Sequence, residues 1–286
     1  MSILSKKIDF VVFFTVNYAN PNGDPLMGNM PRTDYDGYGE VSDVCIKRKI
    51  RNRMQDLGYD IFVQSQDRIT DGHKSLESRF NAQFDNKMAD EVVAQEACKK
   101  WIDVRSFGQV MTFQNRALGI RGPVSISLAK SLSPVDIITM QITRSTNGME
   151  AEVGKARSSD TMGNKHYVEF GVYKLTGSIN CYFAEKTGFT DQDADVIKEA
   201  LRTLFENDMS SARPEGSMAI KKIYWFVHPN KLGVASSAKI HSLVQARVKS
   251  GIEKATSYED YIIEIDQERF NSYKELGLEL NELEGI

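Results

Sequence analysis

The chain has 286 residues, of which 41% are hydrophobic, so it can bury a large core as one domain or as one domain with an insertion. The formal net charge is −3, but residues 251–286 contain ten acidic and three basic side chains, so the rest of the chain is mildly basic. No apolar run approaches the roughly 18 residues that span a bilayer, and the N-terminus lacks a signal-peptide pattern, so we expect a cytoplasmic protein with no membrane partner.

The first element and the loop after it are the most informative part of the chain. Residues 6–16, KKIDFVVFFTV, are β-branched and aromatic, and they predict a central strand that is apolar on both faces. Asn20-Pro21 and Asn22-Gly23 follow as turn dipeptides, because Asn and Gly tolerate positive φ and proline restricts the residue before it. A turn-rich loop therefore connects this strand to the next element.

The loop leads into a basic helix predicted over residues 43–57, which Ser42 or Asp43 can cap. Its spacing places three apolar residues on one face, Ile46, Ile50 and Leu57, and three cations elsewhere, Lys47, Arg48 and Arg51. Backbone amides, a helix N-terminus and cations then share one neighbourhood, which favours a site for a phosphate-rich polymer. A solvated surface helix has the same composition and stays open as the alternative.

Strands and helices alternate through the rest of the chain. We predict a helical insertion at about residues 60–105 and strands at 110–114, 124–129 and 135–143. Residues 144–166 have few apolar side chains and four cations (Arg144, Lys155, Arg157 and Lys165), so a protruding loop or hairpin is expected there. A long strand at 167–184, a helix at 190–208 capped by Thr190 and Asp193, and a last core strand at 218–228 follow.

This order of elements predicts an α+β fold of the split βαβ type, as in ferredoxin-like and RNA-recognition proteins. We expect one domain over residues 1–286, ending in an acidic, helical tail at about 251–286 that is solvated or docks on a basic face of a neighbouring subunit. Cys45, Cys98 and Cys181 are isolated in apolar patterns, which favours reduced core residues over disulfides or ligands. The four histidines show no metal-type spacing, so no cofactor is expected.

Five motifs occur in order along the chain, namely NPNGDP, PRTD, SDVCIKRKIR, WIDVRSFGQV and IRGPVSIS. With them the chain resembles the RAMP-type backbone subunit of CRISPR Cascade complexes, most closely the subtype I-C (Csd) form. The resemblance implies a modified RNA-recognition fold without enzymatic activity, several copies of which form a helical filament on one guide RNA (crRNA) in antiviral defence. A projecting hairpin displaces a base at intervals, and the guide pairs with target DNA. The other implied partners are further Cascade subunits and a recruited nuclease-helicase.

The resemblance also implies which residues line the guide RNA. These are Asn20, Asn22 and Arg32 in the loop, Lys47, Arg48 and Arg51 on the helix, and Arg105, Ser106, Phe107 and Gly108 in the VRSFG motif. Arg121 and Arg144 are further candidates, and Met162 is a possible apolar wedge of the hairpin. Other interpretations stay open, because Phe107 could be a core aromatic, Arg105 could pair with Asp103, and Arg121 could cap a turn.

The chain lacks the aromatic RNP1 pattern of ordinary RNA-recognition modules, so we expect binding directed at the RNA backbone. On this basis Lys47→Ala with Arg51→Ala should weaken RNA binding without unfolding the protein. Two enzymatic alternatives remain. One is a metal-dependent endoribonuclease that uses the loop carboxylates Asp24, Asp34, Asp36 and Asp43, and the other is a histidine-dependent guide-processing nuclease.

Overall fold

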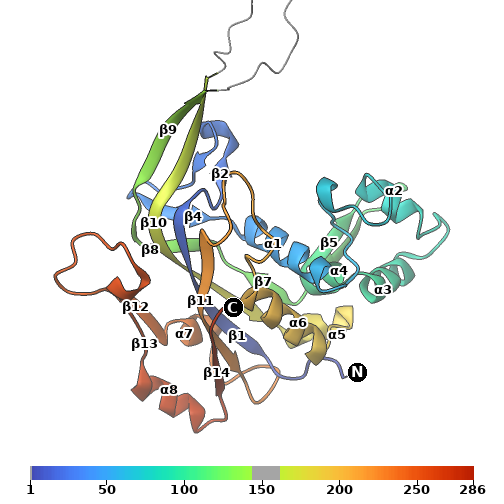
Figure 1. The fold of residues 1–286 in the computed structure, drawn as a ribbon. Helices are drawn as coiled ribbons and strands as arrows, with labels where there is room; N and C mark the ends of the chain where they lie inside the picture. Colours follow the sequence, from blue (N-terminus) through green and yellow to red (C-terminus); the bar gives the residue numbers. More distant parts are fainter. Residues whose placement is uncertain (1, 144–161) are drawn as a thin grey trace, which may run out of the picture.

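An antiparallel sheet organises the protein in the computed structural model, which describes residues 2–143 and 162–286 (Figure 1). Its strands, in spatial order, are β14 (Glu279–Leu283), β11 (Met218–Val227), β1 (Ile8–Ala19), β10 (Met162–Ile179), β8 (Ala129–Pro134) and β4 (Tyr38–Val41). β7 (Val124–Ile126) and β9 (Ile137–Thr143) also pair with β10. The predicted mixture of helices with an antiparallel sheet is confirmed.

Strand β1 is buried on both faces, as its sequence predicts. Phe10 and Phe14 belong to one apolar core and Phe13 belongs to a second, and all three side chains are fully buried. Successive side chains of a strand point to opposite faces, so an uninterrupted apolar run requires a layer of protein on each side. The sheet is therefore the middle layer of three.

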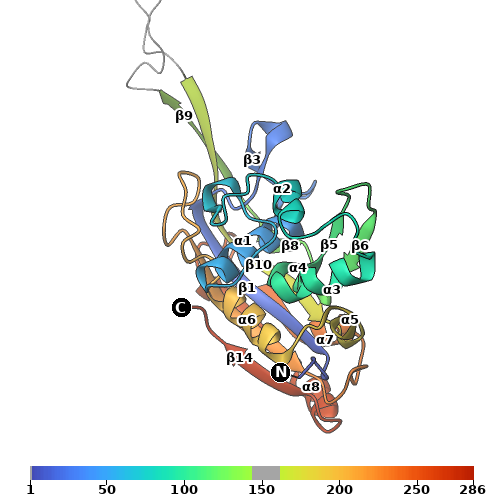
Figure 2. The ribbon, with the colours of Figure 1, turned by 90° about the vertical axis from the view of Figure 1, so that its right-hand side faces the viewer.

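Helices cover the first face of the sheet, to which the Phe10 and Phe14 side chains of β1 point (Figure 2). They are α1 (Asp43–Asp56), which follows β4, and α5 (Cys181–Thr187) and α6 (Asp191–Arg202), which lie between β10 and β11 in the chain. The predicted caps are confirmed, because Ser42 accepts the Cys45 N–H, and Thr190 and Asp193 cap each other reciprocally.

Two details of these helices differ from the prediction. Leu57 is 38% exposed, because α1 ends at Asp56 and Met54 takes the buried position. Residues 181–184 belong to α5 instead of continuing the strand, because Asn180 accepts the N–H groups of Tyr182 and Phe183 and so caps a helix there.

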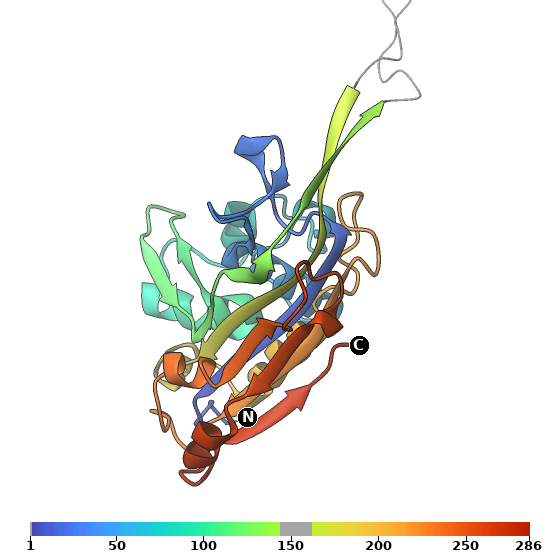
Figure 3. The ribbon, with the colours of Figure 1, turned by 90° about the vertical axis from the view of Figure 1, so that its left-hand side faces the viewer.

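The C-terminal part of the chain covers the second face (orange and red in Figure 3). It consists of α7 (Ser237–His241), β12 (Val244–Val248), β13 (Tyr261–Ile265) and α8 (Gln267–Lys274), and then β14. The expectation that 218–228 is the last core strand, followed by a helical tail, was wrong. β14 pairs with β11, and the second face of β1 and β11 needs this covering layer.

Residues between α1 and β7 form a third apolar cluster of their own. Phe62, Phe80 and Trp101 are at its centre. Its elements are α2 (Leu76–Asn81), α3 (Asp90–Lys100), α4 (Ile102–Phe107), β5 (Gly108–Met111) and β6 (Leu118–Arg121). The predicted strand at 124–129 is divided between β7 and the first residue of β8.

The three cysteines are free thiols, with Cys98 and Cys181 buried and Cys45 half-buried. Burial raises the pKa of Cys98 and of Cys181 to about 11. In the part of the chain that the structure describes, no helix is both long and apolar enough to cross a membrane.

Both faces of β1 should contribute to stability. Phe14→Ala and Phe13→Ala should each lower the free energy of unfolding by about 3–5 kcal/mol, because each leaves a cavity in a different core. Urea denaturation measures the loss, with Tyr35→Ala at a fully exposed position as the control. A cost for Phe14 alone would mean that the second core is not packed as described.

The buried thiols should be unreactive in the native protein. At pH 8 the thiolate is the reactive form, and the raised pKa keeps Cys98 and Cys181 protonated. Ellman's reagent should therefore label them slowly before unfolding and rapidly in urea. Immediate labelling of all three thiols in the folded protein would contradict the burial.

Candidate nucleic-acid interface

The loop between β1 and α1 is folded by its own side chains. It contains β2 (Gly23–Asp24), the short helix η1 (Pro25–Met27) and β3 (Met30–Pro31). Asn22 Oδ1 accepts the backbone N–H of Ser42 at 2.9 Å, so the loop is fastened to the N-terminus of α1. Asn20 Nδ2 donates to the carbonyl of Asn29 at 2.7 Å, and Arg32 pairs with Asp24 at 3.3 Å. The structure thus brings these three predicted residues together.

The predicted cations of α1 have internal partners. Lys47 pairs with Asp43 one turn earlier at 3.0 Å, and Arg48 donates to the carbonyl of Val63 at 2.7 Å. Lys49, which is almost completely buried, pairs with Asp208. Lys47 differs from the other two predicted cations, Arg48 and Arg51, because its ion pair is partly exposed and contributes little to stability.

Arg51 holds a buried carboxylate. Its Nε donates to Asp103 Oδ2 at 3.1 Å, and Asp103 is fully buried and also accepts the backbone N–H groups of Phe62 and Val63. The Arg51 guanidinium lies 5.0 Å from the centre of the Phe107 ring. Asp103 therefore attaches α1 to the third cluster. The alternative that Arg105 pairs with Asp103 was wrong, because Asp103 pairs with Arg51.

Arg105 joins α4 to α6. It pairs with Asp193 through two bonds of 2.7 and 2.9 Å and donates to the carbonyl of Cys98 at 2.6 Å. Such a two-pronged contact with a carboxylate is strong and well oriented. The internal ion pairs of Arg51 and Arg105 occupy their guanidinium groups and so do not favour contact with RNA. Such a contact stays a prediction.

The remaining VRSFG residues are mainly structural in this geometry. Ser106 is buried, and its Oγ has no hydrogen-bond partner among the described residues. Gly108 has φ +76°, and a Cβ there would lie 2.2 Å from the carbonyl oxygen of Ile120, so glycine is required for packing within the protein. Arg121 is exposed and stacks over Phe183 at 4.4 Å, so its guanidinium is accessible to a ligand.

A long hairpin of β9 and β10 projects from the body beside the β2–β3 loop (Figure 1). Met162, the first described residue of β10, is 60% exposed, and Met140 and Ile142 on β9 are each 49% exposed. Arg144 and the other loop positions up to 161 lie outside the described residues. The stem presents apolar side chains to solvent, as an intercalating or docking element would.

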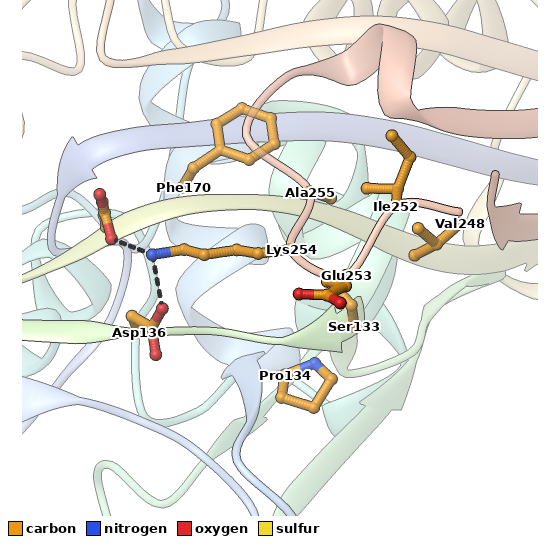
Figure 4. A pocket seen from close by; sticks show the side chains of 10 residues that line it. Ser133, Pro134, Asp136, Phe170, Val248, Ile252, Glu253, Lys254 and Ala255 are labelled. Carbon is orange, nitrogen blue, oxygen red and sulfur yellow. Dashed lines mark hydrogen bonds and ion pairs between the residues drawn. The ribbon is translucent and has the colours of Figure 1, made fainter. Parts of the chain in front are cut away.

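Lys254 in the β12–β13 connection pairs with two carboxylates at the root of this hairpin. Its Nζ lies 2.8 Å from Asp136, just before β9, and 2.6 Å from Glu169 on β10, and these hydrogen bonds raise the pKa of Lys254 (Figure 4). A pocket of about 330 Å³ lies under these ion pairs. These side chains are partly or largely exposed, so the pairs orient the connection against the hairpin root and contribute little to stability.

Tyr18 is a candidate contact residue that the sequence reasoning missed. It is 54% exposed at the end of β1, has the unusual φ of +48°, and its ring centre lies 5.8 Å from that of Tyr167 on β10. Non-glycine residues in the left-handed region cluster at functional sites. Its position two residues before the turn dipeptide Asn20-Pro21 was the available signal.

Three of the four loop carboxylates proposed for a nuclease have internal partners. Asp24 pairs with Arg32, Asp43 with Lys47, and Asp34 with Lys130, whose hydrogen bond lowers the pKa of Asp34. Within residues 2–143 and 162–286, no three acidic, histidine or cysteine side chains are grouped as metal ligands would be.

The fold and the site together define a class of protein, an antiparallel α+β protein with a folded polar loop, a basic first helix and a projecting hairpin at one end of the sheet. Residues 6–266 match the family model described as CRISPR-associated protein Cas7. The chain therefore belongs to the Cas7 family.

A curated relative has the same family description, and two solved structures share the fold. The CRISPR-associated protein Cas7 of Haloferax volcanii is 26% identical over 215 residues, which are 68% of this chain and 62% of that protein's length. A structure described as "CRISPR RNA-guided surveillance complex, pre-nicking" has a TM-score of 0.52 at 16% identity, covering 87% of this chain and 84% of its own. A second, described as "CRISPR RNA-guided surveillance complex", has a TM-score of 0.51 at 14% identity, covering 96% and 87%. These two likenesses concern the fold.

Arg51 and Lys47 should differ sharply in their effect on stability. Arg51→Met leaves the Asp103 carboxylate buried without its cation and should lower the free energy of unfolding by about 3 kcal/mol. Lys47→Met removes only a partly exposed pair and should cost less than about 1 kcal/mol. Urea denaturation of both variants measures the difference, and equal costs would contradict the role given to Asp103. The Lys47/Arg51 double alanine variant is therefore unsuitable for testing RNA binding alone.

Proposed function

We propose that this chain is a guide-binding backbone subunit of a type I CRISPR antiviral surveillance complex, of the subtype I-C form. Several copies stack along one crRNA and present it for pairing with target DNA, together with other subunits and a recruited nuclease-helicase. The chain itself holds RNA and performs no chemistry on it. Its membership of the Cas7 family, and the titles of the two solved structures with its fold, support this proposal.

The observation that carries the proposal is the common position of the polar loop and the hairpin stem. The β2–β3 loop, Tyr18 at the end of β1 and the β9–β10 stem adjoin one another, and the loop is bonded to the N-terminus of α1. Amides, an exposed aromatic ring and cations suit single-stranded RNA, which is bound through phosphates and by stacking. Sequence is then read by base pairing between guide and target.

Removal of two accessible cations should weaken RNA binding without unfolding the protein. Lys47→Ala with Lys165→Ala should lower the affinity for a repeat-spacer transcript and make its salt dependence shallower by about 1.4 in log–log slope, if each contacts one phosphate. Filter binding across a salt series measures both quantities.

The matched control is Lys274→Ala with Arg247→Ala, which removes the same charges from α8 and β12. This control should leave affinity and slope unchanged, and circular dichroism checks that each variant is folded. If both double variants lose the same affinity, binding depends on net charge and the proposed face is wrong.

A further inference from the structure

Five ionisable side chains lie together between α7 and the sheet, at the end of β1 that is far from the hairpin (Figure 1). Asp9 and His228 are fully buried, and the side chains of Lys7 and His241 are only 11% and 17% exposed. The cluster consists of Lys7 and Asp9 at the start of β1, Lys174 on β10, His228 just after β11 and His241 on α7. Within this cluster one carboxylate faces two lysines and two histidines.

The hydrogen bonds of His228 fix it as a neutral imidazole. Its Nδ1 accepts the backbone N–H of Val234 at 3.1 Å, and its Nε2 donates to Asp9 Oδ2 at 2.8 Å. A second proton on Nδ1 would face that N–H group, so the bond to Val234 would be lost on protonation. Asp9 Oδ2 also lies 3.1 Å from the Lys7 ammonium, so its charge is already balanced.

His241 attaches α7 to β10. Its Nε2 donates to the carbonyl of Gly177 at 2.9 Å and lies 3.7 Å from Asp9 Oδ1, which accepts no hydrogen bond from the described residues. Burial, with the nearby ammonium of Lys174, holds the pKa of His241 below its ordinary value of 6.5. The folded protein therefore binds this proton less tightly than the unfolded chain does, and stability is lost as the pH falls below about 6.5.

The two lysines of the cluster hold the backbone of the covering layer. Lys7 Nζ donates to the carbonyl of Ala235 at 3.2 Å, and Lys174 Nζ donates to the carbonyl of Val244 at 2.8 Å. Leu243 lies between these two points in the chain and is fully buried in the second core. The cluster thus fixes the first residues of the layer that covers the second face of the sheet.

We propose that this cluster is an acid-sensitive latch, which holds α7 on the sheet at neutral pH and releases it when His228 and His241 take up protons. Each proton adds a positive charge beside Lys7 and Lys174, and a buried charge without its own partner is unfavourable. Histidine changes its charge between pH 5 and 8, so the latch responds to mild acid. This inference concerns the covering layer and does not rest on the proposed function.

Hydrogen exchange of the full chain at pH 7.5 and at pH 5.5, corrected for the intrinsic exchange rate at each pH, tests the latch. If opening takes up one proton, its equilibrium constant rises by up to about tenfold for each pH unit below the ordinary histidine pKa. The amides of residues 234–244 should therefore exchange about tenfold faster at the lower pH. The amides of α1 and α6 should keep their protection.

The four histidines of the chain provide matched variants. His228→Gln with His241→Gln should abolish the pH response, because glutamine keeps an N–H donor and takes up no proton. His241→Gln alone should reduce the response, and it provides the test if the double variant does not fold. His73→Gln with His166→Gln removes two histidines outside the cluster and should respond as the wild-type chain does.

Three results would overturn the proposal. The first is equal protection of residues 234–244 at the two pH values in the wild-type chain. The second is an unchanged pH response in the folded variants that lack latch histidines. The third is a loss of protection in α1 and α6 together with α7, which would mean that acid unfolds the whole chain and that no separate latch exists.

Discussion

The burial of β1 on both faces is the constraint on which the rest of the structure depends. An apolar strand at the centre of a sheet must be covered twice, and the chain does so with α1, α5 and α6 on one side and with its last 50 or so residues on the other. The loop that leaves β1 is then fixed at one end of the sheet, beside the hairpin formed by β9 and its neighbour β10. The candidate interface is a consequence of this strand order.

Several cationic side chains form ion pairs inside this protein. Lys49, Arg51 and Arg105 each hold a buried or half-buried carboxylate, because a cation taken out of water is stable only with a partner. Their carboxylates connect α1, α4 and α6, so these cations fix the helices in place. Under the proposed function, phosphate is contacted by more accessible cations such as Lys47 and by backbone amides, and the Tyr18 ring stacks on a base.

Local features were predictable from sequence and long-range ones were not. The two-sided strand, the Ser42 cap and the Thr190–Asp193 capping box follow from patterns within a few residues, and the structure confirms them. Arg51 meets Asp103 at a separation of 52 residues and Arg105 meets Asp193 at 88, and no periodicity encodes such pairs. For the same reason the exposure of Tyr18 became visible only in three dimensions.

The most direct test of the central claim is ultraviolet cross-linking of the full chain to a bound guide transcript, followed by mass spectrometry of the linked peptides. The account predicts cross-links from the end of β1, the β2–β3 loop and the β9–β10 stem, with Tyr18 among the linked residues because aromatic rings that stack on bases cross-link readily. Cross-links confined to β12, β13 and α8 would place the RNA on the second face of the sheet and contradict the account.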